Sequence, residues 1–278
     1  MDLDIDHLRG WIGATRESQD EISPRLANAL AAVLDEDPGL TPGDLAPAGI
    51  QWCLSPEIAP MHGLGPDGHP ARGGFLPPVP LPRRMWAGGE LEFLGDFRVG
   101  DAVRRISRVG DVTAKSGRTG ALCFVTVHHD YHGPRGLALR ERHDIVYRGA
   151  DAPAAGTPPA PPHAHADHRL EVDGNAVLLA RYSAVTFNGH RIHYDRDYCR
   201  EAENYPGLIV HGPLQATYLL RMAMQMNAGR LPARFRFRGT SPLFDGAAFS
   251  VNGRAEGDGT ALWVLDRNGG MTMQATAG

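Results

Sequence analysis

The chain has 278 residues, long enough for two domains or one large one. Its residues are 42% hydrophobic and 22% charged, and 28 Lys and Arg against 32 Asp and Glu give a formal charge of -4. This composition is that of an ordinary globular protein, and the absence of a basic run argues against nucleic acid as a partner. No apolar stretch approaches the roughly 18 residues of a membrane span.

The opening residues and the cysteines bear on the compartment. Met1 to Asp6 is acidic, which fits neither a secretory signal nor an arginine-rich transit peptide. Cys53, Cys123 and Cys199 are scattered, so they indicate neither a disulfide framework nor a zinc site. We therefore expect a cytoplasmic protein without a bound metal.

The first half reads as a helix followed by strands. Ser23 and Pro24 look like an N-cap and a first helical residue, and an apolar face follows. Strand-like runs come next, at 91 to 98, 101 to 109, 121 to 132 and 136 to 147. The order predicts an α+β unit with an antiparallel sheet. Phe75 to Gly89, which occupies the place of a helix in the repeat described below, is too rich in proline for one.

A linker divides the chain. Residues 149 to 168 are rich in proline and alanine with almost no bulky apolar side chain, so we expect domains at 1 to 148 and 169 to 278. His163, His165 and His168 lie in this segment and are expected to be solvated.

The second half repeats the order of the first. A strand is expected near 178 to 187, and a mostly buried helix from about 213 to 227. Strand-like runs then follow at 233 to 239, 247 to 256, 260 to 266 and 271 to 276. The pattern alone supports an α+β fold with a structural repeat.

Polar groups crowd the segment before the second helix. Eight residues, 188 to 195, hold six polar side chains including His190 and His193, more than a connecting loop requires. Gly212 and Pro213 mark the helix start, where unpaired backbone N–H groups carry positive partial charge. A carbonyl oxygen placed there would become more electrophilic, and His193 could move a proton beside it.

These residues resemble the MaoC-like R-specific enoyl-thioester hydratases. The signature Asp-x-Asn-x-x-His is matched at Asn188, His190 and His193, followed by an apolar segment that ends in His211 and Gly212. Asn188 stands where that family usually has aspartate, and asparagine cannot accept a proton. The wider pattern, with Pro82 to Gly89, resembles the branch of mesaconyl-C4-CoA and itaconyl-CoA hydratases and the mitochondrial 3-hydroxyacyl-thioester dehydratase.

The resemblance implies a double hot-dog fold and syn addition of water to a 2-enoyl thioester, or its reversal, without a cofactor. His193 would be the general acid/base, Asn188 would hold the water, and the Gly212 N–H would donate to the thioester oxygen. His211 would belong to the substrate-binding residues. Only the second half would be catalytic, while the first would shape the acyl pocket. Asp195 is a weaker candidate for the missing carboxylate. A homodimer is compatible with this reading.

Three arginines are candidate anion binders. Arg83, Arg84 and Arg191 could recognise a substrate carboxylate or CoA phosphates, because the guanidinium fork matches both. Arg191 lies nearest to His193 in sequence, which favours a dicarboxylic acyl group. Trp86 could stack on adenine or simply pack.

The expected substrate is thus an acyl-CoA, most specifically a branched dicarboxylic 2-enoyl-CoA. A fatty-acid or polyketide 3-hydroxyacyl-thioester dehydratase, using CoA or acyl carrier protein, is the alternative within enzymes. A thioesterase would need a carboxylate where Asn188 stands, and a non-catalytic acyl-CoA binder is a further alternative.

Overall fold

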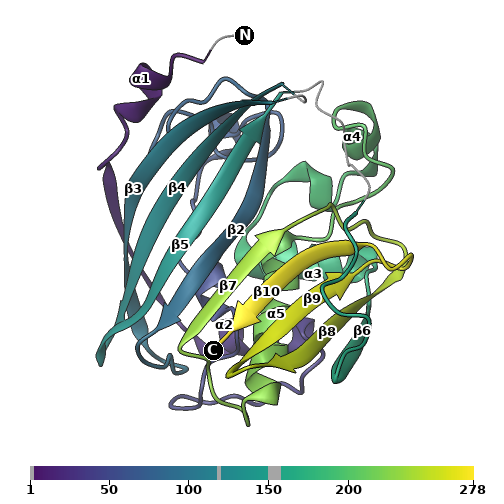
Figure 1. Ribbon diagram of the computed structural model, residues 1–278. Coiled ribbons are helices and arrows are strands. Elements are labelled where there is room, and N and C mark those ends of the chain that lie inside the picture. Colours follow the sequence, from purple (N-terminus) through teal and green to yellow (C-terminus); the bar gives the residue numbers. More distant parts are fainter. Residues whose placement is uncertain (1–2, 118–119, 150–157) are drawn as a thin grey trace.

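The computed structural model describes residues 3–117, 120–149 and 158–278. Within these ranges ten strands form one antiparallel sheet, in the order β1-β3-β4-β5-β2-β7-β10-β9-β8-β6 (Figure 1). The first-half strands are β1 (Thr15–Glu21), β2 (Arg83–Phe93), β3 (Ala102–Gly117), β4 (Gly120–Gly133) and β5 (Gly136–Arg148). The second-half strands are β6 (His168–Asp173), β7 (Arg234–Gly239), β8 (Ala248–Glu256), β9 (Gly259–Leu265) and β10 (Met271–Ala277).

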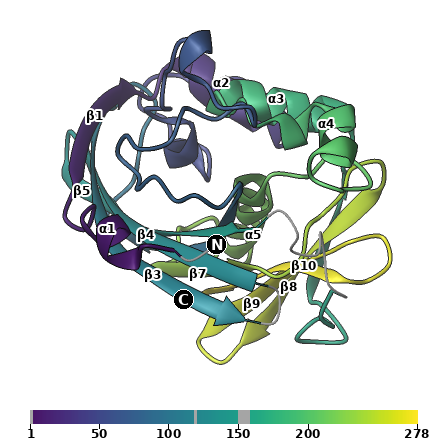
Figure 2. The same ribbon diagram turned by 90° about the horizontal axis from the view of Figure 1, so that it is seen from above.

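The helices lie mainly on one side of this sheet. They are α1 (Ile5–Arg9), α2 (Pro24–Val33), α3 (Ala176–Thr186), α4 (Arg196–Glu201) and α5 (Gly212–Met226), with 3-10 turns at Ile50–Cys53, Met61–Gly63 and Arg191–His193. Seen from above, α2, α3 and α4 form a row opposite the sheet, with α5 between the two layers (Figure 2).

The two halves join through β2 and β7. Gly88 to Glu92 pairs antiparallel with Arg234 to Arg238, so the two sheets are continuous. β7 reads RFRFRG, and its alternation buries Phe235 and Phe237 while the arginines face outward. The edge-to-edge pairing expected for a double hot-dog fold is confirmed.

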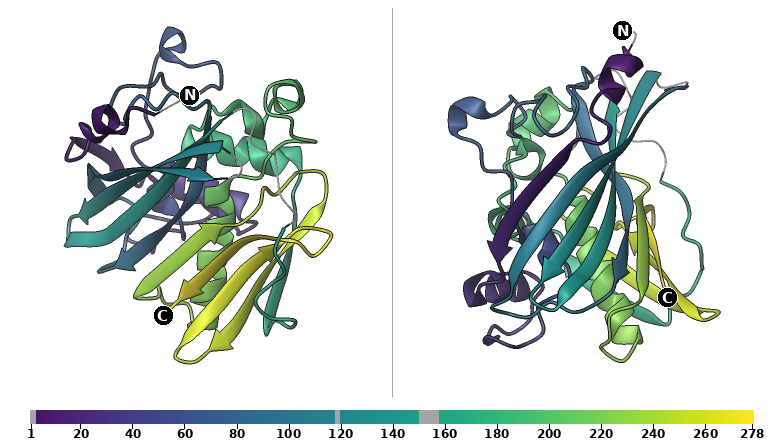
Figure 3. Two further views of the ribbon diagram at one scale, coloured as in Figure 1. Left: turned by 45° about the horizontal axis from the view of Figure 1, so that its top comes forward. Right: turned by 90° about the vertical axis from the view of Figure 1, so that its left-hand side faces the viewer.

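The second half wraps its sheet around a buried helix. Residues of α5 contact β7, β8, β9 and β10, and Figure 3 shows the helix running along one face of these strands. Nine residues of α5 are buried, among them Leu214, Leu219 and Leu220. The helix predicted at 213 to 227 is therefore confirmed, and Gly212 is its first residue.

The first half has a shorter helix that covers only part of its sheet. Ser23 caps α2 by accepting a hydrogen bond from the Leu26 N–H at 3.2 Å, as its sequence predicted. Leu26 and Leu30 share one apolar cluster with Leu91 and Leu139 of the sheet. Irregular chain from Leu54 to Pro82, interrupted by one 3-10 turn, lies beyond this helix and helps line a cavity.

Several sequence expectations are wrong in detail. The strand expected near 178 to 187 is helix α3, because Asn175 caps it through the Leu178 N–H at 2.9 Å and only Leu179 and Tyr182 of the helix are buried. Phe75 to Gly89 does not stand in for a helix, since its last seven residues open β2. β1 and β6 were not predicted, because their residues are mostly polar and exposed and show no apolar pattern.

The linker falls partly outside the described residues, which omit 150–157. His163 was expected to be solvated, but its ring lies 5.7 Å from that of Trp263, and its Nε2 lies 3.4 Å from Glu256. His165 and His168 are exposed as expected. Within the described ranges no helix is long and apolar enough to cross a membrane.

Candidate active site

The polar segment expected to carry the chemistry lies between α3 and α5. Phe187 ends α3 in the left-handed conformation, with φ of 52°, and turns the chain so that Asn188 points toward the interior. A 3-10 turn then buries His193. Backbone pairing of the Ile209 N–H with the Ile192 oxygen at 2.9 Å brings the apolar segment before α5 alongside this turn.

His193 is enclosed and held in one tautomer. Its Nδ1 lies 2.7 Å from the backbone oxygen of Ile209, which can only accept, so Nδ1 carries the proton and Nε2 keeps a lone pair. Burial lowers the pKa of His193 to about 4, although the hydrogen bond to Ile209 opposes this shift. At neutral pH the ring is therefore an uncharged proton acceptor.

His211 supports His193 from behind. The two rings stack with centroids 3.5 Å apart and an interplanar angle of 18°. The Nε2 of His211 lies 2.9 Å from the Ser183 hydroxyl, and the residue is fully buried. His211 is not among the residues that line the cavity, so its geometry favours a positioning role over the substrate contact expected for it.

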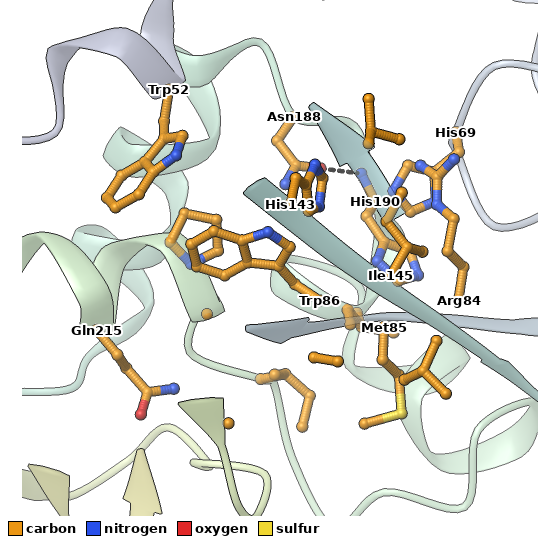
Figure 4. A pocket seen from close by; sticks show the side chains of 18 of the residues that line it. Trp52, His69, Arg84, Met85, Trp86, His143, Ile145, Asn188, His190 and Gln215 are labelled. Carbon is orange, nitrogen blue, oxygen red and sulfur yellow. Dashed lines mark hydrogen bonds between the residues drawn. The ribbon is translucent and has the colours of Figure 1, made fainter. Parts of the chain in front are cut away.

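Asn188 presents its amide to the same cavity. Its Oδ1 accepts the His190 backbone N–H at 2.9 Å, shown as the dashed line in Figure 4. This bond fixes which end of the amide is oxygen and leaves Nδ2 as the donor available to a ligand. The group can hold a water or hydroxyl oxygen, but it cannot take a proton.

The first turn of α5 supplies a backbone donor. Gly212 is its first residue, and among the described residues no acceptor pairs with its N–H. A Cβ at this position would lie 2.9 Å from the indole of Trp86, so only glycine fits without a shift. Trp86 in turn packs against Trp52 and Phe237, with ring centroids 5.3 and 4.7 Å away. The amide and the indole therefore form one wall.

One cavity of about 760 Å³ joins these groups. Asn188, His193, Gly212 and Trp86 all line it, as do His190 and Gln215. In Figure 4 Trp52 and Gln215 lie on one side of this space and His69 and Arg84 on the other. The cavity also reaches polar residues of the first half, including Arg105, His129, Tyr131, Glu141 and His143.

The far wall of the cavity is a buried polar network. Glu141 accepts hydrogen bonds from the Trp52 indole at 2.9 Å and the Tyr131 hydroxyl at 2.7 Å. Arg105 donates to the backbone oxygens of Leu54 and Ser55, and burial lowers the pKa of His143 to about 3. The strand residues of this wall come from alternate positions of β3, β4 and β5, so a two-residue period of polar side chains is the sequence signal that could have predicted them.

A loop of the first half meets the motif directly. Gly68 has φ of 87°, and a Cβ there would collide with the backbone oxygen of Gly189. The Arg191 N–H donates to the Asp67 backbone oxygen at 2.9 Å, and its guanidinium donates to the Pro66 oxygen at 3.0 Å. The only local signal for this loop in the sequence is Asp67-Gly68-His69, which is typical of an ordinary turn and did not predict a part of the site.

The loop brings a carboxylate and an imidazole to the site. The Oδ2 of Asp67 lies 3.1 Å from Nδ1 of His69, and its Oδ1 accepts the His69 backbone N–H at 3.0 Å. The His69 ring lies 4.1 Å from that of His190, which lies 5.5 Å from that of His193. A row of three imidazoles, His69, His190 and His193, thus runs from Asp67 to the proton acceptor of the motif.

The three predicted anion binders separate in the structure. Arg83 is buried in an ion pair with Glu203, and Arg191 is held by Asp195 at 2.7 Å; neither is among the cavity-lining residues. Arg84 lines the cavity, and within the described ranges no carboxylate pairs with it. The geometry thus favours structural roles for Arg83 and Arg191, because their partners already satisfy them. It also disfavours Asp195 as a substitute for the missing aspartate.

One group of residues has the composition of a metal site. Ligand-type atoms of Asp67, His69 and His190 lie within 4.8 Å of one another. Two features oppose a divalent cation there. The Asp67 carboxylate already bonds to His69, and the nearby guanidiniums of Arg72 and Arg84 act to lower the pKa of His69. The same positive field repels a cation, so the set fits proton transfer better than metal binding.

The fold and this cavity define a hot-dog protein that can add water to the double bond of a 2-enoyl thioester, or eliminate water from a 3-hydroxyacyl thioester. The profile of the hydroxyacyl-thioester dehydratase type 2 family matches residues 49–245. The mesaconyl-C(4)-CoA hydratase of Chloroflexus aurantiacus is 42% identical over 268 residues, which cover 96% of this chain and 95% of that protein. The chain belongs to the hydroxyacyl-thioester dehydratase type 2 family, whose members are hydro-lyases.

Solved structures agree on the fold. A MaoC-like dehydratase from Phytophthora capsici superposes with a TM-score of 0.70 and 14% identity, covering 99% of this chain and 98% of that one. A Mycobacterium tuberculosis protein described as having a double hotdog fold gives a TM-score of 0.58 and 13% identity, with 96% and 95% covered. The expected double hot-dog architecture is therefore confirmed.

Proposed function

We propose that this enzyme reversibly hydrates a 2-enoyl-CoA whose acyl group carries a carboxylate, of the mesaconyl-C4-CoA type. The observation that carries the proposal is Arg84, a guanidinium on the cavity wall with no carboxylate partner among the described residues. Arg84 is half-buried, and a partly desolvated cation without a carboxylate beside it favours an anionic ligand. The Chloroflexus relative supports the same acyl group.

The site residues suit the chemistry of this substrate. The thioester oxygen accepts the Gly212 N–H, which stabilises enolate charge, and such a donor contributes roughly 3 kcal/mol to catalysis. Nε2 of His193 exchanges a proton with the acyl group, and the Asn188 amide holds the water that adds to the β-carbon. In a mesaconyl-C4 thioester that carbon also bears the carboxylate, so its anion partner must lie close to these groups.

The thioester itself supplies the reactive carbonyl, so the proposed reaction needs no further cofactor. His190 and His69 lie on the Arg84 side of the cavity, and burial together with neighbouring charges lowers the pKa of both. Arg84 therefore keeps its positive charge at this end at any ordinary pH, whereas neither imidazole is held in its charged form. Arg84 has a side-chain hydrogen bond with Tyr147, and a plain fatty acyl group would supply no carboxylate to this charge, which disfavours the 3-hydroxyacyl dehydratase of lipid synthesis.

Hydration rates with two thioesters test the proposal. Loss of the enoyl-thioester absorbance should be much faster with mesaconyl-C4-CoA than with crotonyl-CoA, which lacks the carboxylate. Because a charged hydrogen bond contributes about 1.5 to 3 kcal/mol, Arg84→Met should lower kcat/KM for mesaconyl-C4-CoA roughly 10- to 150-fold and leave crotonyl-CoA nearly unchanged. Equal losses with both substrates would remove Arg84 from carboxylate recognition, and no hydration of either would refute the proposed reaction.

A further inference from the structure

We propose that proton transfer in this enzyme is shared between two imidazoles, His193 of the second half and His69 of the first, with Asp67 as the positioning residue for His69. The inference rests on the proposed hydration and goes beyond it, because it places a catalytic group in the half expected to shape only the acyl pocket. It also accounts for a site in which asparagine replaces the usual carboxylate.

The loop that carries His69 is built to hold it at the motif. The approach of Gly68 to the Gly189 oxygen leaves no room for a side chain on residue 68. Two hydrogen bonds join this loop to the motif. The Arg191 backbone N–H donates to the Asp67 oxygen, and the Arg191 guanidinium donates to the Pro66 oxygen. The Arg191 guanidinium also donates to Asp195 at 3.0 and 2.7 Å, so the residue that contacts the loop is itself held in place.

Asp67 and His69 form a carboxylate–imidazole pair. With Nδ1 of His69 on the carboxylate, Nε2 is the ring nitrogen left for the cavity, and no partner for it lies among the described residues. Burial raises the pKa of Asp67, but the bonds and charge of His69 outweigh it and hold the carboxyl ionised. An anion behind the ring stabilises its protonated form. His69 can therefore alternate between base and acid.

His193 alone lacks such support. A backbone oxygen, not a carboxylate, holds its Nδ1, and its stacking partner His211 is also uncharged because burial lowers the pKa of that ring well below its ordinary value. Asn188 cannot share the proton. The motif therefore lacks an imidazole that a carboxylate supports. His69, which Asp67 supports, supplies one and lines the same cavity.

The proton account for dehydration balances with one proton on the pair. Nε2 of neutral His193 takes the α-proton, and the C–H electrons form the enolate that the Gly212 N–H stabilises. The enolate then re-forms the carbonyl and the double bond as the C–O bond breaks, and His69 protonates the departing hydroxide to give water. The pair ends with its proton on His193. Hydration runs these steps in reverse, and exchange with solvent resets the pair.

Two half-reactions can be measured separately. In deuterated water His193 alone exchanges the α-proton of a 3-hydroxyacyl-CoA, whereas loss of the hydroxyl also needs His69. We therefore expect His69→Gln to lower elimination from 3-hydroxybutyryl-CoA and citramalyl-CoA at least about 100-fold while α-deuterium exchange stays within about 10-fold of wild type. His193→Gln should abolish both. His62→Gln, an exposed histidine in the preceding turn, is the matched control and should change neither.

The positioning role of Asp67 has its own readout. Asp67, Arg84 and Arg72 act on the charge of His69, and the ring of His190 lies beside it; of these groups only the Asp67 carboxylate favours the imidazolium. Asp67→Asn should therefore shift the His69 limb of the pH profile of kcat/KM to lower pH. A structural role would lower the rate without moving that limb. Removal of metal by dialysis against a chelator should leave wild-type activity unchanged; loss restored by Zn²⁺ would replace the proton-transfer role by a metal site.

The outcomes separate this inference from the proposed function. If the wild type turns over and His69→Gln eliminates water at the wild-type rate, the proposed role of His69 is overturned and the hydratase proposal stands. The same holds if His69→Gln loses exchange and elimination equally while it unfolds at the wild-type temperature. Absence of wild-type turnover with either thioester overturns the hydratase proposal and this inference with it.

Discussion

The guanidinium of Arg83 lies 3.0 Å from the carboxylate of Glu203, and only 5% of the Arg83 side chain is exposed. Arg84, the next residue in β2, lines the cavity on the other face of the sheet. Neighbours in a strand point to opposite faces, so two arginines that look equivalent in sequence have different environments. One is enclosed with a carboxylate, and the other faces the ligand space.

Breaking the buried Arg83–Glu203 ion pair should lower the free energy of unfolding without weakening substrate binding. Arg83→Met leaves Glu203 buried without its partner, which typically costs about 3 to 5 kcal/mol of unfolding free energy. Denaturant unfolding should show this loss, while KM of the folded fraction stays within about twofold. Arg84→Met is the comparison, with the opposite pattern. A large KM change in Arg83→Met would mean that Arg83 reaches the substrate.

Gly212→Ala should disturb the backbone donor. The added Cβ would lie 2.9 Å from the Trp86 ring, so either the indole or the first turn of α5 must move. We expect kcat to fall roughly 10- to 100-fold, because displacing an oxyanion donor removes part of its stabilisation. Adding Trp86→Phe should recover part of the loss by making room. Gly39→Ala, where a Cβ meets nothing within 4 Å, should behave as wild type.

Gly68→Ala should undock the loop that carries His69. The substitution combines an unfavourable left-handed backbone with a collision against the Gly189 oxygen. We expect elimination to fall at least about tenfold, with faster proteolytic cleavage between residues 60 and 75. Gly43→Ala, which has φ of 96° and no neighbour within 4 Å, isolates the backbone cost. Similar kinetic losses in both variants would show that docking is not the cause.

Local pattern explains which parts of this enzyme the sequence could predict. The Gly212-Pro213 start and the apolar run after it predicted α5, because a buried helix has a cap and a period visible in its own residues. α3 was mistaken for a strand since few of its residues are buried. The apolar character of AVLLARYSAVT therefore did not reveal its helical period.

Only the part of the site that comes from the second half could be predicted from the sequence. His193, Asn188 and Gly212 stand within one short segment, and the structure brings them to one cavity. His69 lies more than a hundred residues away, and its approach depends on two glycines that let two backbones touch. A contact of that kind leaves no side-chain pattern. For the same reason the sequence does not show what engages Arg191, because its partners, Asp195 and the Pro66 oxygen, are brought to it by the fold.

Asn188→Asp tests whether positioning or proton acceptance matters at the motif. One carboxylate oxygen can keep the bond from the His190 N–H, so the loop should stay folded. We expect the rate at neutral pH to stay within about tenfold of wild type, whereas Asn188→Leu should lose about 100-fold by leaving the water unheld. The combination Asn188→Asp with His69→Gln should eliminate water faster than His69→Gln alone, because the new carboxyl restores a second acid. No gain in the double variant would argue that residue 188 only positions.

The enclosed histidines should make the fold sensitive to mild acid. Burial lowers the pKa of His143 to about 3 and that of His193 to about 4, while an unfolded imidazole titrates near ~6.5. Between these values the unfolded chain binds protons that the folded chain excludes, so the unfolding free energy falls as pH falls from about 6.5 toward 4. Each histidine contributes up to roughly 1.4 kcal/mol per pH unit in that window. Urea unfolding at pH 7, 6 and 5 measures the slope. His143→Gln should reduce it by up to about that amount, and His62→Gln, which alters an exposed ring, should leave it unchanged; an identical slope in all three proteins would show that His143 is not held neutral.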